Sequence, residues 1–137
     1  MNDEIVEELV RQIASLEKRL HYIETVEKNV FSTIQFTAST ELTISAAEAI
    51  TVTKSYHTVD TIDDDPTDDL LTINGGSVGD ILIIGAASSA RTIEVKDGTG
   101  NLLLAGDFTM DNTQDTLTLF RYSATYWIEL SRSNNAA

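Results

Sequence analysis

The first part of the chain repeats apolar side chains at alternating spacings of three and four, with charged residues between them. Residues 5–30 contain no glycine or proline and are rich in Glu, Leu, Ile, Lys and Arg, which favours a helix. The spacing is a heptad repeat, and its register continues through Glu27 at an a position and Val30 at a d position. The preceding a and d positions form consecutive apolar pairs: Val6, Leu9, Ile13, Leu16, Leu20 and Ile23. We therefore expect a coiled-coil stalk over residues 1–31.

Two side chains that flank this seam indicate the number of helices. Arg19 falls at a g position and Glu24 at an e position, and the segment between them resembles the Arg-h-x-x-h-Glu trimerisation signature of short parallel coiled coils, where h is apolar. The g side chain faces the e side chain of the neighbouring helix, so the arginine stem can cover the wide seam of a trimer. We predict a parallel homotrimer; a dimer and a helix docked on the rest of the chain are the alternatives. A coiled coil of this length is marginally stable alone, so we expect the rest of the chain to contribute to trimerisation.

From Ser32 onward the apolar period changes from helical spacing to two, and Thr, Val and Ile replace Glu, Lys and Leu. This pattern predicts a mainly-β fold, in which an antiparallel β-sandwich or jelly-roll-like domain follows the N-terminal helix. We divide it into a β-rich neck with an acidic loop (32–69) and a C-terminal β-domain (70–137). The expected strands are Thr33–Thr37, Glu41–Ser45, Ile50–His57, Leu70–Asn74, Ile81–Ile84, Thr92–Lys96, Leu102–Ala105, Thr116–Tyr122 and Tyr126–Leu130.

Two of these segments indicate how the sheets are covered. In Thr116–Phe120 the leucines alternate with threonines, as in a half-buried antiparallel strand. In Ile81–Ile84 both faces are apolar, which predicts cover on both sides, by a second sheet or by another subunit.

Composition and charge narrow the class of protein. The net charge is −13, and the residues after Phe31 hold fifteen acidic and five basic side chains, which opposes binding to nucleic acid or an anionic membrane. No apolar run approaches the roughly 20 residues of a membrane span. The acidic start predicts neither a secretory signal nor a transit peptide, so we expect synthesis in a cytoplasm. Without cysteine there are no disulfides or thiolate metal sites.

An acidic stretch around Pro66 is the first candidate site. Asp63, Asp65 and Asp68 could supply oxygen ligands to a hard cation such as Ca²⁺, although the stretch lacks the glycine and glutamate of an EF-hand loop. The alternative, which we favour, is a solvated loop that blocks edge-to-edge association. We expect no cofactor.

Catalytic residues are scarce. A nucleophile needs an adjacent base and a third group that orients it. His21 falls on the outer side of the stalk, and His57 lies in a β-branched strand without a nucleophile motif beside it. We expect surface or structural roles for both histidines and predict that the protein is not an enzyme.

The aromatic residues near the C-terminus are the second candidate site. Tyr122, Tyr126 and Trp127 could form a platform on which a sugar stacks. Strand alternation instead places Trp127 with Glu129 on one face and the apolar residues around them on the other, which would be the core. Core or interface packing of Trp127 is therefore the preferred alternative to ligand contact.

The run from Gly75 to Asn135 resembles a C-terminal β-module of tail-fibre, head-fibre and related virion proteins of tailed bacteriophages. Its order of short motifs carries the resemblance: Gly75-Gly76, Gly79-Asp80, Arg91–Asp97 before Gly100–Leu102, Gly106–Phe108, Asp115–Leu119 and Tyr126–Asn135. The segment Arg121–Thr125 departs from it, because a polar turn with Gly or Asn is expected before the tryptophan. The resemblance implies a trimeric, non-enzymatic appendage of a virion.

Three functions compete on these grounds. The preferred one is a short fibre or capsid decoration (cement) protein that projects from a phage particle, contacts other capsid or tail proteins and is made in the host cytoplasm. The second is a receptor-binding tail-fibre or spike adhesin that recognises a host surface glycan or protein. The third is a glycan-degrading enzyme. The small size of the chain favours the first, since an adhesin with a long shaft and elaborate tip needs more residues.

Overall fold

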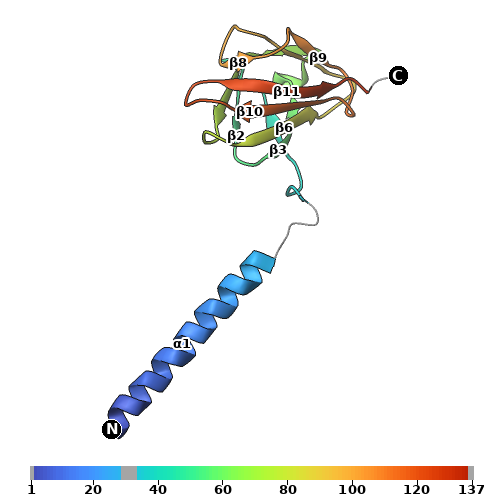
Figure 1. The fold of residues 1–137 in the computed structure, drawn as a ribbon. Coiled ribbons are helices and arrows are strands. Elements are labelled where there is room, and N and C mark those ends of the chain that lie inside the picture. Colours follow the sequence, from blue (N-terminus) through green and yellow to red (C-terminus); the bar gives the residue numbers. More distant parts are fainter. Residues whose placement is uncertain (1, 29–33, 136–137) are drawn as a thin grey trace. The chain divides into compact units, whose positions relative to one another are not determined.

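A computed structural model of the protein describes residues 2–28 and 34–135. The chain divides into two compact units, Met1–Gln35 and Phe36–Ala137. The first contains helix α1 (Asp3–Lys28), and the second consists of β-strands with one short 3-10 helix (Figure 1). The prediction of a mainly-β chain with one N-terminal helix is therefore confirmed. No helix in the described ranges is long and apolar enough to cross a membrane.

Helix α1 begins at a polar cap. The Asn2 side-chain Oδ1 accepts a hydrogen bond from the Glu4 backbone N–H at 3.1 Å, and the Asn2 carbonyl accepts one from Ile5 at 3.0 Å. Asp3 and Glu4 lie in the first turn, where negative charge favours the helix dipole. The helix has 26 residues, which corresponds to about 39 Å at a rise of about 1.5 Å per residue.

The second unit, called the β unit below, contains three sheets of six, two and three strands. The six-stranded sheet (sheet A) has the order β1-β3-β6-β10-β11-β8, and the smaller sheets are β2-β5 (sheet B) and β4-β7-β9 (sheet C). A 3-10 helix, Ile62–Asp64, precedes β4. The strands are β1 (Thr40–Thr43), β2 (Ala49–Val52), β3 (Tyr56–Asp60), β4 (Thr67–Leu70), β5 (Thr72–Gly75), β6 (Ile81–Ala86), β7 (Thr92–Val95), β8 (Leu102–Leu103), β9 (Phe108–Met110), β10 (Thr116–Arg121) and β11 (Trp127–Ser133).

The first part of the β unit winds around one core. Strands β1, β3 and β6 are parallel neighbours, and so are β2 with β5 and β4 with β7. Consecutive strands belong to different sheets, so the chain returns to each sheet one strand further on. This arrangement is β-solenoid-like, and the predicted antiparallel sandwich or jelly roll is wrong. Alternation with period two marks a strand that has one buried face, but it is the same in both architectures and does not specify the partner strand.

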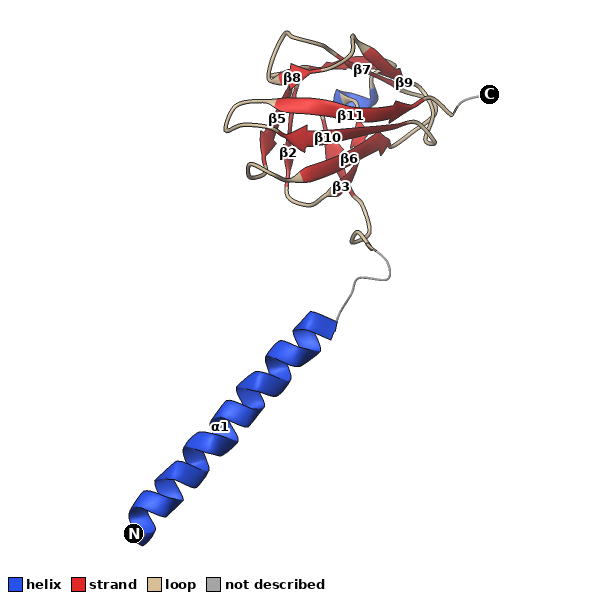
Figure 2. Cartoon of the chain, in the orientation of Figure 1, coloured by secondary structure: helices blue, strands red, loops and turns tan. Residues whose placement is uncertain are grey.

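The last part of the β unit reverses direction. Strand β9 is antiparallel to β7, β10 is antiparallel to β6, and β11 is antiparallel to β10. The β10–β11 register shifts between Thr118 and Leu119, and Leu130 is the extra residue on β11. Figure 2 shows β3, β6, β10 and β11 side by side in the resulting sheet.

The core lies between the three sheets and receives alternate residues of each. Leu117 and Leu119 of β10 are fully buried, while Thr116 and Thr118 are partly exposed, as the sequence predicts for this strand. The same alternation buries Ile93 and Val95 of β7. All the buried apolar residues belong to one cluster, so the β unit has a single core.

Several predicted strands differ from those observed. Residues 34–37 form no strand, and Thr33 lies outside the described residues. The single strand expected at Ile50–His57 is two strands, because the chain turns between Val52 and Tyr56. Strand β9 and the 3-10 helix have no counterpart in the prediction. The segments 32–69 and 70–137 share sheets, and β4 crosses the boundary between them, so both belong to one unit.

Candidate functional site

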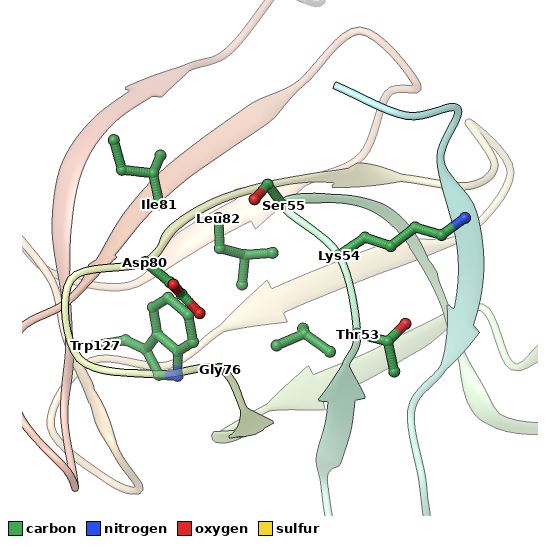
Figure 3. Close-up of a pocket in the computed structure, with 9 residues that line it drawn as sticks. Thr53, Lys54, Ser55, Gly76, Asp80, Ile81, Leu82 and Trp127 are labelled. Carbon is green, nitrogen blue, oxygen red and sulfur yellow. The ribbon is translucent and has the colours of Figure 1, made fainter. Parts of the chain in front are cut away.

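A small pocket opens where the β2–β3 turn, the β5–β6 turn and the start of β11 meet (Figure 3). Its volume is about 170 Å³, below the roughly 300–1,000 Å³ of pockets for drug-sized ligands. The lining combines an apolar base with polar groups at the rim: Val52, Thr53, Lys54, Ser55, Gly76, Asp80, Ile81, Leu82 and Trp127. The pocket has room for one small polar group or one ring.

The β5–β6 turn holds the acidic side of this pocket. Asp80 Oδ2 accepts a hydrogen bond from the Ser77 backbone N–H at 2.7 Å, and the Asp80 N–H donates to the Ser77 carbonyl at 3.0 Å. Gly76 has a positive φ of 72°, and a Cβ there would lie 2.7 Å from Trp127 Cζ2. The close approach of backbone and indole therefore requires glycine at position 76.

The pocket offers hydrogen-bonding groups but no catalytic pair that we recognise. Its lining includes Ser55 and Thr53, which carry hydroxyls, and the Asp80 carboxylate. The Lys54 side chain extends away from the pocket, and its Nζ donates to the Ala38 carbonyl at 3.5 Å (Figure 3). None of its lining residues is a histidine, and both histidines of the chain lie elsewhere. This chemistry suits binding of a hydroxylated or charged small group.

Beyond the pocket, the β10–β11 hairpin exposes two tyrosines. Tyr122 is 63% exposed and Tyr126 is 41% exposed, and the Tyr122 N–H donates to the Tyr126 carbonyl at 3.1 Å. Arg121 holds the intervening turn, since its guanidinium donates to the carbonyls of Ala124 at 2.8 Å and Thr125 at 3.3 Å. These contacts stabilise a turn that has neither Gly nor Asn.

Trp127, the third aromatic candidate, lies in the core. It is 1% exposed, and its Nε1–H donates to the Ile73 carbonyl at 3.2 Å. The Arg121 guanidinium lies 5.2 Å from the indole centroid and covers it. The face assignment made from alternation is wrong, because Ile128 and Leu130 point away from the core that Trp127 enters. Tyr122 and Tyr126 remain as the exposed aromatic candidates.

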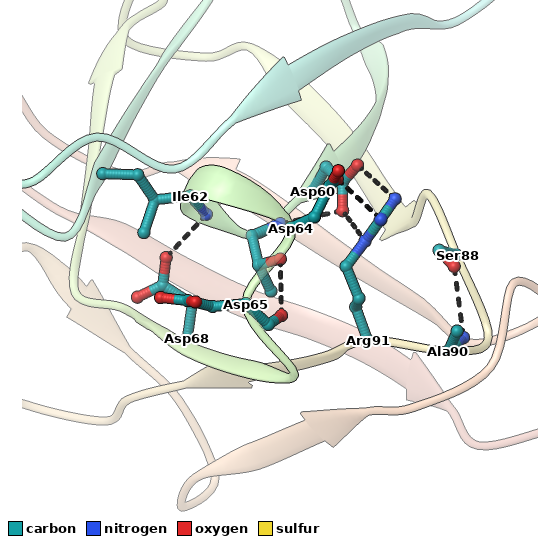
Figure 4. Close-up of polar contacts among 9 residues, drawn as sticks. Asp60, Ile62, Asp64, Asp65, Asp68, Ser88, Ala90 and Arg91 are labelled. Atoms are coloured by element: carbon teal, nitrogen blue, oxygen red, sulfur yellow. Dashed lines mark hydrogen bonds and ion pairs between the residues drawn. The ribbon is translucent and has the colours of Figure 1, made fainter.

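The acidic stretch is organised by a basic residue that the sequence argument did not single out. Arg91 Nε and NH2 each donate to one oxygen of Asp60 at 2.6 Å, and NH1 donates to Asp64 at 2.6 Å (Figure 4). Asp60 is buried, and this paired geometry compensates for the burial of its charge. One signal in the sequence pointed to such ion pairs. Only five basic residues follow Phe31, against fifteen acidic ones, so a basic side chain in this part of the chain is expected to lie near carboxylates.

The three aspartates considered as cation ligands do not converge. Asp68 Oδ2 accepts a hydrogen bond from the Ile62 N–H at 3.0 Å, and its Oδ1 accepts one from the Asp69 N–H at 2.9 Å. Asp63 and Asp65 are exposed. Among the residues that the structure describes, no group of three acidic, histidine or cysteine side chains is placed to hold a metal ion. The stretch is a folded turn held by Arg91 and backbone hydrogen bonds.

His57 is fully buried and closes the turn between β2 and β3. Its Nε2 accepts hydrogen bonds from the backbone N–H groups of Thr53 and Lys54, each at 3.1 Å. Its Nδ1 donates to the Thr40 carbonyl at 2.9 Å. Because Nε2 accepts and Nδ1 donates, the neutral ring carries its proton on Nδ1. His57 thus joins β1 to the turn.

The buried carboxylate of Asp115 has a similar structural role in the turn between β9 and β10. Asp115 Oδ2 accepts hydrogen bonds from the backbone N–H groups of Asp111 and Asn112, each at 3.1 Å. Its Oδ1 accepts one from Asn135 at 2.7 Å. These bonds tie the β9–β10 turn to the end of β11.

Two acidic groups near β8 have lowered pKa values. The hydrogen bond from Arg132 lowers the pKa of Glu129 below its ordinary value, with a further contribution from the Ala105 N–H. The Asp97 N–H, which donates to Asp107, lowers the pKa of the Asp107 carboxyl. These contacts order the corner around β8.

The predicted oligomerisation residues lie along one side of α1. Their apolar members, from Val6 to Leu16, are 41–58% exposed, and Leu20 and Ile23 are also within that range. Arg19 and Glu24 are exposed. Val30 lies outside the described residues. The helix therefore presents an apolar stripe that none of its own residues can cover.

A scan against protein-family models finds no match for this chain, and a search among curated proteins finds no significant match.

Proposed function

We propose that the protein is a non-enzymatic, homotrimeric structural protein of a tailed-phage virion, either a short fibre or a capsid decoration protein. The exposed apolar stripe of α1 carries this proposal. Side chains from Val6 to Ile23 recur at a and d positions over a helix of 26 residues, and each is more than 40% exposed. Exposure of so many apolar groups in water is unfavourable, and self-association through the stripe would bury them.

Three parallel helices are the number that the flanking charges favour. Arg19 at g and Glu24 at e are both exposed, so each is free to reach a neighbouring helix of the assembly. Apolar Ile5 and Val10 widen the stripe beyond the two positions that a dimer buries.

Virion membership rests on the resemblance of Gly75–Asn135 to the β-module of phage fibre proteins. The two parts of the chain, a helix with an exposed apolar stripe and a β unit with a single core, suit such an appendage. We place the stalk at the particle surface, in contact with capsid or tail proteins, and the β unit outward. The chain would be made in the host cytoplasm and assembled there.

Sedimentation equilibrium of the full chain tests the oligomer. The expected mass is about three times the 15.0 kDa of one chain, and a stable monomer would overturn the proposal. A variant with Leu9→Asp and Leu16→Asp should sediment as a monomer, because carboxylates would replace two apolar positions of the seam. Imaging of the intact particle then locates the trimer on the head or the tail.

A receptor-binding adhesin is the second candidate, favoured by the exposed tyrosines and the small pocket of the β unit. Tyr122 and Tyr126 at the hairpin tip provide faces on which a sugar could stack, and Asp80 and Ser55 provide hydrogen-bonding groups nearby. Binding of the labelled trimer to host cells tests this candidate. Tyr122→Ala with Tyr126→Ala should abolish the binding if it is correct, whereas a trimer that does not bind host cells favours the decoration protein.

A further inference from the structure

One row of side chains across the outer surface of sheet A is entirely apolar. Ile81 of β6 pairs with Phe120 of β10, Phe120 pairs with Ile128 of β11, and Ile128 pairs with Leu103 of β8. One chain neighbour of each in its strand is buried, so alternation directs these four side chains away from the core. Ile81 and Leu103 are exposed, and Phe120 and Ile128 are half-buried.

The positions around this row are apolar or hydroxylated. Tyr56 pairs with Ile83 in the next row, Ile83 pairs with Thr118, and Leu130 is exposed at the bulge of β11. The side of sheet A that these strands form is turned toward the viewer in Figure 2. The outer face, as we use the term, consists of Tyr56, Thr58, Ile81, Ile83, Leu103, Thr116, Thr118, Phe120, Ile128, Leu130 and Ser131.

The charged residues of the same strands are engaged elsewhere. Asp60 is buried and bound to Arg91, Arg121 covers the indole of the core tryptophan, and Glu129 is bound to Arg132. Glu41, an exposed carboxylate of the edge strand β1 that pairs with Thr58, lies at the border of the outer face. The rest of the face has no charged residue, although the chain after Phe31 has fifteen acidic residues against five basic ones. An apolar surface with a single carboxylate at its border, on so acidic a unit, needs a partner that covers it.

We infer that the outer face is the contact through which the β units of the trimer meet, so that its occupant is a second copy of this chain. This inference rests on the proposed trimer. Two acidic copies repel each other where carboxylates come together, and the apolar row, which lies away from Glu41, is a surface on which they can meet with little of that repulsion. A basic partner, in contrast, would be attracted to the acidic surfaces of the β unit.

The length of chain between the units supports the same occupant. Seven residues, 29–35, join the end of α1 to the start of the β unit. A segment of that length spans at most about 25 Å, so helices that associate in parallel confine three β units to a small volume. At such a high effective concentration, a contact of modest area suffices.

Thiol labelling of full-length variants tests the assignment, because the chain has no cysteine of its own. Ile81→Cys and Leu103→Cys place single thiols at the two ends of the apolar row. Thr51→Cys, at the exposed position of β2 in sheet B, is the matched control. Maleimide should label the two row thiols about ten-fold more slowly than the control, since thiol reactivity depends on access. With Leu9→Asp and Leu16→Asp added, the row thiols should react as fast as Thr51→Cys.

The outcomes separate this inference from the proposed function. A trimeric mass with equal labelling rates at all three sites overturns the outer-face contact and leaves the trimer standing. Slow labelling that persists in the monomeric stalk variant also overturns it, because the face would then be covered within one chain. A monomeric mass for the unmodified chain overturns both proposals.

Discussion

The side-chain amide of Asn101 binds the backbone of Ile73 through both of its polar ends. Nδ2 donates to the Ile73 carbonyl at 2.8 Å, and Oδ1 accepts from the Ile73 N–H at 2.9 Å. Trp127 Nε1–H donates to the same carbonyl, and the Trp127 N–H donates to the Asn101 carbonyl. The amide thus stands beside β5 where a further strand would pair, and it links the two-stranded sheet to β11.

Loss of this amide should destabilise the β unit. In Asn101→Leu the buried Ile73 N–H loses its acceptor, and we expect the free energy of unfolding to fall by about 1–3 kcal/mol. Urea denaturation followed by the fluorescence of Trp127 measures it. Asn74→Ala, at an exposed position of β5 next to Ile73, is the control and should change stability by less than about 0.5 kcal/mol. Equal effects of the two substitutions would contradict the role of Asn101.

His57 should be needed for the turn that carries one wall of the pocket. His57→Leu introduces an apolar side chain of similar size and leaves the Thr53 and Lys54 N–H groups without their acceptor. We expect a loss of about 2–6 kcal/mol, since each of the two unsatisfied groups costs about 1–3 kcal/mol. Thermal unfolding compared with Thr51→Leu, an exposed change on the preceding strand, measures it. A His57→Leu protein as stable as the control would show that the ring is dispensable.

Gly76→Ala should disturb the core at the base of the pocket. The new Cβ would lie 2.7 Å from Trp127 Cζ2, and the φ of 72° disfavours any side chain. We expect a loss of about 1–3 kcal/mol and a change in the near-ultraviolet circular dichroism of the only tryptophan. Gly79→Ala is matched, because it has a φ of 99° and open space around it. It should show the backbone cost without the change in the tryptophan signal.

The local sequence pattern predicted where the helix and the strands occur better than it predicted which strands pair with each other. The heptad spacing of α1 and the alternation of Leu117 and Leu119 depend on near neighbours, and both correspond to observed elements. The pairing of β1 with β3 and the Asn101–Ile73 contact join residues far apart in the chain, which no local period encodes. Trp127 was assigned to the wrong face because Ile128 is also apolar, and composition alone could not identify the core side.

The candidate sites show the same division. The sequence prediction included Tyr122 and Tyr126 in strands, whereas both are exposed and lie in the turn between β10 and β11. The pocket unites Ser55 and Asp80 from separate turns with an indole from β11, and each polar residue alone resembles any other turn residue. Arg91 joins two aspartates that lie 31 and 27 positions before it, so its role depends on the winding of the chain.

Stability should fall in acid through Glu129. Its pKa is lowered in the folded state by the hydrogen bond from Arg132, so its contribution is present above the ordinary value of about 4.5 and is lost as pH falls through the folded pKa. Glu129→Gln should therefore be less stable than the unmodified protein at about pH 7, and the difference should shrink at about pH 3. Urea titrations of both proteins across this range measure it. A difference that is constant with pH would contradict the ion pair.

The stalk should respond to loss of its flanking charges in a way that reports the number of chains. Arg19→Gln with Glu24→Gln removes the proposed interhelical ion pairs, each of which contributes about 0.3–0.5 kcal/mol to stability. Because a trimer contains three such pairs, the melting temperature should fall modestly, and more at low salt than at high salt, where screening already weakens the pairs. Lys18→Gln removes one charge from the outward side of the same helix and should leave the trimer unchanged. If the two variants melt alike at low salt, Arg19 and Glu24 do not meet across the seam, and the case for three chains rests on the apolar stripe alone.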